Sequence, residues 1–123
     1  MILKDVLNKS TALDRAFQAL GDSSRRAMLQ RLSRGPATVS ELAHPLAISL
    51  PAVMQHLAVL ESSGLVRSRK AGRVRTCQIN PRALGMAEQW INQRRIEWEL
   101  RLDRLGHYLE TLKTKGENHG DHE

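Results

Sequence analysis

The most restrictive feature of this chain is the stretch SLPAVMQHLAVLESSGLV, residues 49–66, which has the spacing of a short α-helix. Val53, Leu57 and Leu60 fall at i, i+4 and i+7, so they share one face and are predicted to be buried. The opposite face is small and uncharged, and it consists of Pro51, Gln55, Ala58 and Ser62. A solvated helix surface normally carries charged residues. Either another part of the protein or a partner molecule is therefore expected to cover this face.

Four short helices are predicted before Gly64, and capping residues mark where they begin. Asp22 is suited to cap the second helix, which a Gly-Pro pair at 35–36 ends. Thr38 begins a Thr-Val-Ser-Glu sequence with the spacing of a capping box, and Ser49 is suited to cap the fourth helix. The third and fourth helices, joined by a tight connection, make a helix-turn-helix candidate.

The next segment changes from a helical to an extended pattern. LVRSRK and RVRTCQI are strand-like runs that meet at Ala71 and Gly72, which predicts a β-hairpin. Its arginines are expected to lie along one side of the hairpin or at its tip. A helix-turn-helix followed directly by a basic hairpin predicts a mainly α, winged helix-turn-helix fold, with the hairpin as the wing.

The positive charge is concentrated in two segments. The chain has 19 Lys and Arg against 13 Asp and Glu, a net charge of +6. No acidic residue interrupts the run of Arg67, Arg69, Lys70, Arg73, Arg75 and Arg82, nor the run of Arg25, Arg26, Arg31 and Arg34. Such clustering favours a polyanion, because each neutralised phosphate releases counterions. The alternative is a solvated surface with excess arginine.

Together, the uncharged helix face and the basic hairpin predict a DNA-binding surface. Gln55 is suited to a bidentate pair with adenine, Leu50 and Met54 to thymine methyl groups, and Ser49 to a phosphate. Arg73 is the candidate for insertion into the minor groove or for a phosphate contact. His56 fits DNA contact or packing beside Leu60 equally well. The full candidate set is Ser49, Leu50, Pro51, Met54, Gln55, His56, Arg67, Arg69, Lys70, Arg73 and Arg75.

From Pro81 the chain predicts one long helix with a coiled-coil seam. Apolar residues recur at heptad spacing, at Leu84, Ile91, Trp98, Leu105 and Leu112, with Leu102 and Leu109 between them in the second half. If helical throughout, residues 81–112 span about 48 Å, which is too long for a small domain to bury alone. The first half is expected to pack on its own domain through Leu84, Trp90 and Ile91, because Glu88 and Arg95 interrupt its seam. A second copy of the chain is therefore the expected partner of the second half.

The remaining features limit the domain organisation and the class of protein. Residues 1–112 are expected to form one DNA-binding and dimerisation domain, and residues 113–123, which lack periodic apolar residues, a disordered tail. No apolar run approaches the roughly 20 residues that span a bilayer, and one cysteine cannot form an intramolecular disulfide, so a cytoplasmic protein is expected. The sequence contains no phosphate loop and no nucleophile with a spaced base. We therefore expect no enzyme activity.

The segments ALGDSSRRAMLQRL, TVSELAHPLAISLPAVMQHLAVLESSGLV and GRVRTCQINP, in this order, resemble the ArsR/SmtB family of bacterial winged-helix repressors over roughly residues 12–100. The resemblance implies a homodimer held by the first and last helices, whose two fourth helices bind successive major grooves of a palindromic operator. It maps the family's DNA-reading positions onto Leu50, Pro51, Met54 and Gln55. Leu50 and Met54 stand where the family usually has a polar residue. The implied dimer interface comprises Leu13, Phe17, Ile91, Trp98, Leu102, Leu105, Leu109 and Leu112.

The metal-ligand motifs of that family do not match this chain. ELAHPL stands where some members carry a Cys-x-Cys pair. His107 and Glu110 fit the second half of another site, but Arg94 and Ile96 occupy its first half and cannot bind metal. His119 and His122 make an equally weak pair, and the single Cys77 is expected in the core. We therefore expect no metal site and no cofactor.

These observations predict a sequence-specific, homodimeric, DNA-binding transcriptional repressor that does not respond to metal. Two alternatives stay open. One is a winged-helix module that binds a protein through the uncharged helix face. The other is a repressor induced by a small organic effector, or a metal, at the dimer interface near Trp90 and Trp98. The sequence identifies no effector.

Overall fold

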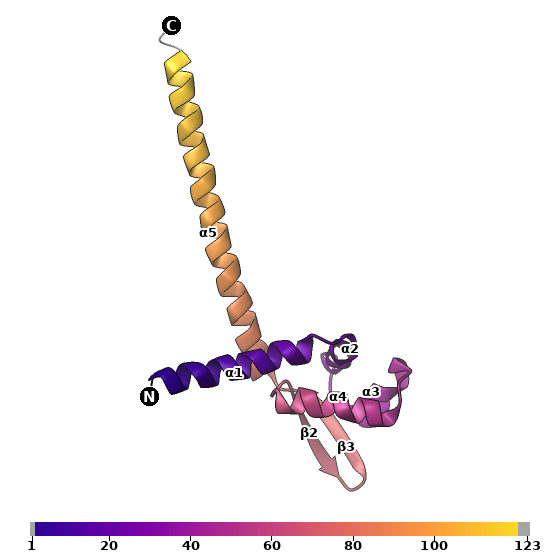
Figure 1. Ribbon diagram of the computed structural model, residues 1–123. Helices are drawn as coiled ribbons and strands as arrows, with labels where there is room; N and C mark the ends of the chain where they lie inside the picture. The colour runs from indigo at the N-terminus through magenta and orange to yellow at the C-terminus, as the bar shows by residue number, and fades with distance from the viewer. Residues whose placement is uncertain (1, 121–123) are drawn as a thin grey trace. The chain divides into compact units, whose positions relative to one another are not determined.

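A computed structural model describes residues 2–120 of the chain and the side chains of residues 11–116. Its elements are helix α1 (Ile2–Leu20), helix α2 (Ser23–Leu32), strand β1 (Ala37–Thr38), helix α3 (Val39–Ala43), a 3-10 helix η1 (His44–Leu46), helix α4 (Leu50–Ser62), strands β2 (Val66–Ala71) and β3 (Val74–Ile79), and helix α5 (Pro81–Gly120) (Figure 1). The chain divides into two compact units, Met1–Ala87 and Glu88–Glu123. This division lies within α5, whereas the sequence predicted one domain to residue 112.

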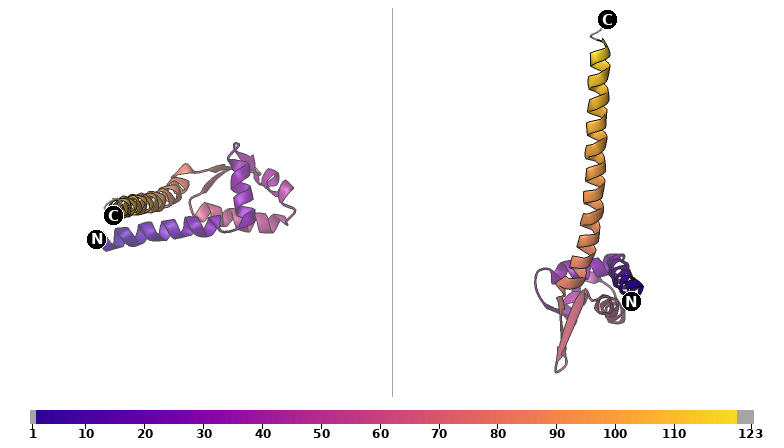
Figure 2. Two further views of the ribbon diagram at one scale, coloured as in Figure 1. Left: turned by 90° about the horizontal axis from the view of Figure 1, so that it is seen from above. Right: turned by 90° about the vertical axis from the view of Figure 1, so that its left-hand side faces the viewer.

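The predicted winged helix-turn-helix fold is confirmed. Helices α3 and α4, with η1 between them, are bent against each other by 116°, close to the angle usual for a helix-turn-helix. Ala47 makes the turn into α4 with a left-handed backbone, φ +53°. The β2–β3 hairpin extends from this unit beyond its helices (Figures 1 and 2).

The predicted caps begin the helices where the sequence placed them. Side-chain oxygens of Asp22, Thr38 and Ser49 accept hydrogen bonds from the N–H groups at the starts of α2, α3 and α4. Gly64 follows α4 with φ +80°, a conformation that glycine adopts without strain. Helix α1 differs from the prediction, because it runs for 19 residues from Ile2 and is not one of the short helices expected before Gly64.

The sheet contains one strand that the sequence did not predict. Strand β3 lies between β2 and β1 in an antiparallel sheet. Its Cys77 pairs with Ala37 of β1 on one side and with Ser68 of β2 on the other. Strand β1 has only two residues, which is too short for the alternation that identifies a strand. It fixes the wing to the start of α3.

The core of the first unit confirms the burial predicted for α4. Val53, Leu57 and Leu60 are at most 1% exposed. They pack in one cluster with buried residues of every neighbouring element, namely Ala19, Met28, Leu29, Leu32, Ala37, Leu42, Leu65, Val66, Cys77 and Ala83. The packed core therefore fixes the position of α4 and of its outer face.

The buried Cys77 gives a testable prediction. Its side chain is fully buried, and burial raises the pKa of the thiol above its ordinary value of 9.0, with a further contribution from the Glu61 carboxylate. Because the thiolate is the reactive form, we expect a thiol reagent to label the native protein at least about tenfold more slowly than the protein in guanidinium chloride. Mass spectrometry over time measures both rates. Equal rates would contradict the burial.

The second unit is the continuation of α5. This helix runs unbroken for 40 residues, to Gly120, so residues 113–120 are helical where the sequence predicted disorder (Figure 2). Lys113, Lys115 and Glu117 are good helix formers that extend an already nucleated helix without an apolar face, past the poorer helix formers Thr114 and Gly116. The rest of the predicted tail, residues 121–123, lies outside the described residues, as do the side chain of His119 and the whole of His122.

Leu84, the first predicted seam residue of α5, is half-buried and packs on the core of the first unit, whereas the seam residues from Ile91 on are exposed. Ile91, Trp98, Leu102, Leu105, Leu109 and Leu112 are each between 46% and 59% exposed. Leu13 and Phe17 of α1, the other predicted interface residues, are half-buried. Soluble monomers rarely expose apolar side chains in such a continuous row.

Within residues 2–120, no single helix is long and apolar enough to cross a membrane. Helices α3–η1 and α4 would pass only when counted together, and the 116° bend separates them.

Candidate nucleic-acid interface

The outer face of α4 is exposed in the isolated chain, although it lacks charged residues. Leu50 is 54% exposed and Met54 39%, and Pro51 and Gln55 are exposed as well. Ser49 accepts a hydrogen bond from the Ala52 N–H at 3.3 Å, so its oxygen is occupied as the cap of α4. These side chains remain exposed beside the described side chains of residues 11–87, so packing against that part of the first unit does not explain why the face lacks charge.

A hollow joins this face to the wing. It has a volume of about 440 Å³ and is lined by Thr38, Val39, Ser40, Leu50, Met54, Lys70, Arg73, Val74 and Arg75. Two candidate residues of α4 thus share one concave surface with three basic candidates of the hairpin. The sequence placed these residues on separate elements, and the structure brings them together.

The basic side chains of the hairpin do not lie on one side, so that prediction was wrong. In the β2–β3 register Arg67 pairs with Gln78 and Arg69 with Thr76, whereas Lys70 pairs with Arg75. Side chains alternate between the two faces of a strand. Arg67 and Arg69 therefore lie on the outer face, and Lys70 and Arg75 on the face that also carries the buried Cys77. Counting charges along each strand missed this because the offset between strands decides the face.

Two of the hairpin arginines have partners within the protein. Arg67 donates to the Asn80 side chain at 2.9 Å. Arg75 lies 3.8 Å from the Glu61 carboxylate, which also accepts a hydrogen bond from Ser68. Glu61, at the end of α4, thereby ties both strands of the wing to the helix.

The other three basic residues of the hairpin are available to an external anion. Arg69, Lys70 and Arg73 are exposed, and none has an ion-pair or side-chain hydrogen-bond partner within residues 11–116. Arg73 lies beside Gly72, whose φ of +63° makes the turn. Free cations at the end of a projecting hairpin are suited to phosphate oxygens.

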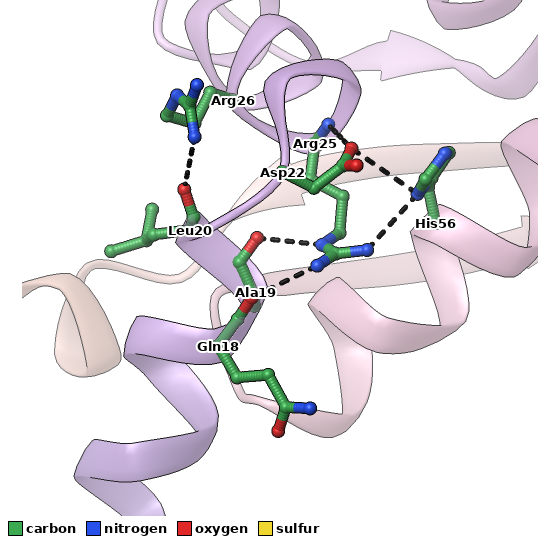
Figure 3. Close-up of polar contacts among 7 residues, drawn as sticks. All are labelled: Gln18, Ala19, Leu20, Asp22, Arg25, Arg26 and His56. Atoms are coloured by element: carbon green, nitrogen blue, oxygen red, sulfur yellow. Dashed lines mark hydrogen bonds and ion pairs between the residues drawn. The ribbon is translucent and has the colours of Figure 1, made fainter.

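The second basic segment, Arg25 to Arg34, was interpreted as a patch for a polyanion, but most of its arginines contact groups within the protein. Arg26 donates to the Leu20 carbonyl at 2.8 Å, and Arg31 contacts the Gly35 carbonyl and the Glu41 carboxylate, each at 3.2 Å. Arg25 contacts Gln18, Ala19 and His56 (Figure 3). Arg34 is the one member of the segment without a side-chain partner in the part of the chain with described side chains.

His56 faces α2 instead of the exposed face of α4. Its Nδ1 atom lies 3.3 Å from Nη1 of Arg25 and 3.7 Å from Oδ2 of Asp22 (Figure 3). Asp22 also accepts a hydrogen bond from the Arg25 N–H at 3.0 Å, and this bond holds the pKa of the Asp22 carboxyl below its ordinary value of 3.8. His56, which was a candidate for DNA contact, is thus part of a polar cluster between helices.

The chain offers no evident metal centre where the structure describes it. Among residues 11–116, no group of three or more His, Cys, Asp and Glu side chains is placed to hold a metal ion.

Comparisons with known proteins agree with this geometry. Residues 20–69 match a family model described as a helix-turn-helix domain. The HTH-type transcriptional regulator Rv2034 of Mycobacterium tuberculosis is 52% identical over 71 residues, which cover 58% of this chain and 66% of that protein, just under two thirds of its length.

A solved structure decides the family. The crystal structure of an ArsR family transcriptional regulator is 50% identical to this chain, covers 73% of it and 93% of its own length, and has a TM-score of 0.70. The chain belongs to the ArsR family. A more distant solved structure, of a possible ArsR-family regulator from Mycobacterium bovis, is 25% identical to this chain and has a TM-score of 0.57. Its solution structure, of a homodimeric winged helix-turn-helix DNA-binding domain, covers 76% of this chain and 87% of the solved one.

Proposed function

We propose that this ArsR-family regulator is a homodimeric, sequence-specific DNA-binding protein that represses transcription by occupying a palindromic operator. The hollow between α4 and the wing carries this proposal, because it combines exposed apolar side chains of a helix with cations. Leu50 and Met54 are suited to contact thymine methyl groups, and Gln55 is suited to adenine. Lys70 and Arg73 are suited to the adjacent phosphates.

The exposed seam of α5 supports a dimer. Its apolar side chains are typical of a helix that packs against a second helix, and the relative from Mycobacterium bovis is a homodimer. A two-fold dimer places two α4 helices about 34 Å apart, one turn of DNA, and therefore selects a palindromic site. A dimer bound over a promoter excludes polymerase, which is the basis of the proposed repression.

Fluorescence anisotropy tests the proposal. Binding of the purified protein to its own upstream DNA and to a scrambled duplex is measured across a salt series. We expect tighter binding to the native fragment, by about 10³-fold or more, and affinity that falls steeply with salt on both DNAs. Equal, weak binding to both duplexes would contradict the proposal.

The main alternative is a module that binds a protein through the same face of α4. The free cations of the wing favour DNA, since an apolar protein interface does not need them. Salt separates the two cases: phosphate contacts weaken steeply as ionic strength rises, whereas an apolar protein interface does not. An inducer at the dimer interface would appear as a ligand that releases bound DNA.

A further inference from the structure

We propose that Arg25 is a positioning residue for DNA binding: its guanidinium joins the end of α1 to the DNA-reading helix α4 through His56. This inference rests on the proposed function. It assigns to Arg25 a task distinct from contact with phosphate, which its place in a basic segment had suggested.

The first part of this link is the C-terminal end of α1. The last carbonyl groups of a helix have no partner within it and carry partial negative charge. Nε of Arg25 donates to the Ala19 carbonyl at 2.7 Å, and Nη2 donates to the Gln18 carbonyl at 3.0 Å (Figure 3). One side of the guanidinium therefore holds two adjacent carbonyls in the fixed geometry of its planar fork.

The second part is the contact with α4. Nη1 of Arg25 lies 3.3 Å from Nδ1 of His56. An arginine side chain only donates, so this contact is a hydrogen bond in the tautomer of His56 that carries its proton on Nε2 and accepts at Nδ1. Asp22 closes the cluster, because its carboxylate binds the Arg25 backbone at 3.0 Å and lies 3.7 Å from the same histidine nitrogen.

The position of His56 on α4 explains how the link affects DNA binding. His56 directly precedes Leu57 of the core stripe and directly follows Gln55 of the outer face. The packed core sets the depth of α4, and Glu61 ties the last turn of the helix to the wing through Ser68 and Arg75. The contact from Arg25 adds a second directional restraint on the rotation of α4, near its middle and from the end of α1. Rotation of α4 would carry Gln55 away from a base edge.

Two pairs of variants test this role. Arg25→Lys keeps the positive charge at the end of α1 but loses the fork that reaches α4. Arg26→Lys is its matched control, because Arg26 binds the Leu20 carbonyl of the same helix end and makes no hydrogen bond or ion pair with α4 in the part of the chain with described side chains. His56→Ala removes the acceptor. His56→Asn restores an acceptor oxygen near the place of Nδ1.

Affinities for the native upstream duplex and the scrambled duplex are measured for all variants, with thermal unfolding in parallel. Arg25→Lys and His56→Ala are expected to lose about fivefold or more in specific affinity, while Arg26→Lys and His56→Asn stay near wild type. The salt slope is expected to stay unchanged, since loss of a phosphate contact would reduce it by about one. Binding to scrambled DNA is expected to change little.

Three results would overturn the inference. They are wild-type specific affinity in Arg25→Lys, a reduced salt slope in that variant, or equal losses in His56→Asn and His56→Ala. The last result also decides the case if Arg25→Lys does not fold. If the wild-type protein binds both duplexes equally, the proposed function fails and this inference fails with it. Specific binding by the wild type with an unaffected Arg25→Lys refutes the inference alone.

Discussion

Replacing Leu105 and Leu109 together with glutamate is expected to produce a monomer that loses operator binding. Both side chains are more than half exposed on α5, and a second copy of that helix is their proposed partner. Two charges in the seam repel their counterparts and cannot be buried. Separating the two DNA-binding units removes the gain from joined half-sites, so we expect specific affinity to fall by about 10²–10⁴-fold. Sedimentation velocity measures the mass, and anisotropy the affinity.

The matched control places two glutamates on the opposite side of the same helix. His107→Glu with Thr111→Glu has the same four-residue spacing and alters exposed positions. It adds no charge to the seam, so this variant is expected to remain a dimer. Unchanged sedimentation of the Leu105 and Leu109 variant would refute the interface on α5.

The second large effect separates recognition of sequence from attraction to phosphate. Gln55→Ala is expected to lose about 1–3 kcal/mol of preference for the correct base at each half-site and little on scrambled DNA. Arg73→Ala is expected to weaken binding to all sequences and to reduce the salt slope by about one per half-site. Anisotropy on both duplexes across a salt series measures the two effects together.

Two exposed positions outside the proposed interface provide controls for this pair. Gln30→Ala removes a glutamine from α2, and Arg104→Ala removes an arginine from α5. Both variants are expected to bind like the wild type. Equal losses of Gln55→Ala and Arg73→Ala on specific and scrambled DNA would show that the two residues do not differ in role.

The sequence predicted the parts of the fold that depend on local rules. The stripe of Val53, Leu57 and Leu60 follows from helix periodicity, and the caps at Asp22 and Ser49 follow from the need of a helix start for an acceptor. The hairpin followed from two extended runs around Gly72. Each of these features needs only neighbouring residues, so a single sequence contains the information.

Features that depend on the pairing of distant segments were missed. Strand β1 forms only because Ala37 pairs with Cys77. No local sequence pattern predicts a pair between residues so far apart in the chain. The same limit explains why Lys70 and Arg75 were placed wrongly relative to Arg67. The charge of Arg25 was evident, but its partners lie in α1 and α4 and became visible only in the folded chain.

The exposed apolar row on α5 has a consequence for how the regulator responds to its own abundance. If only the dimer holds the operator, then below the dimer dissociation constant the amount of active species rises with the square of the protomer concentration. A twofold change in synthesis would then change the amount of dimer about fourfold. Expression of the gene would thus set a threshold for silencing, even without any effector.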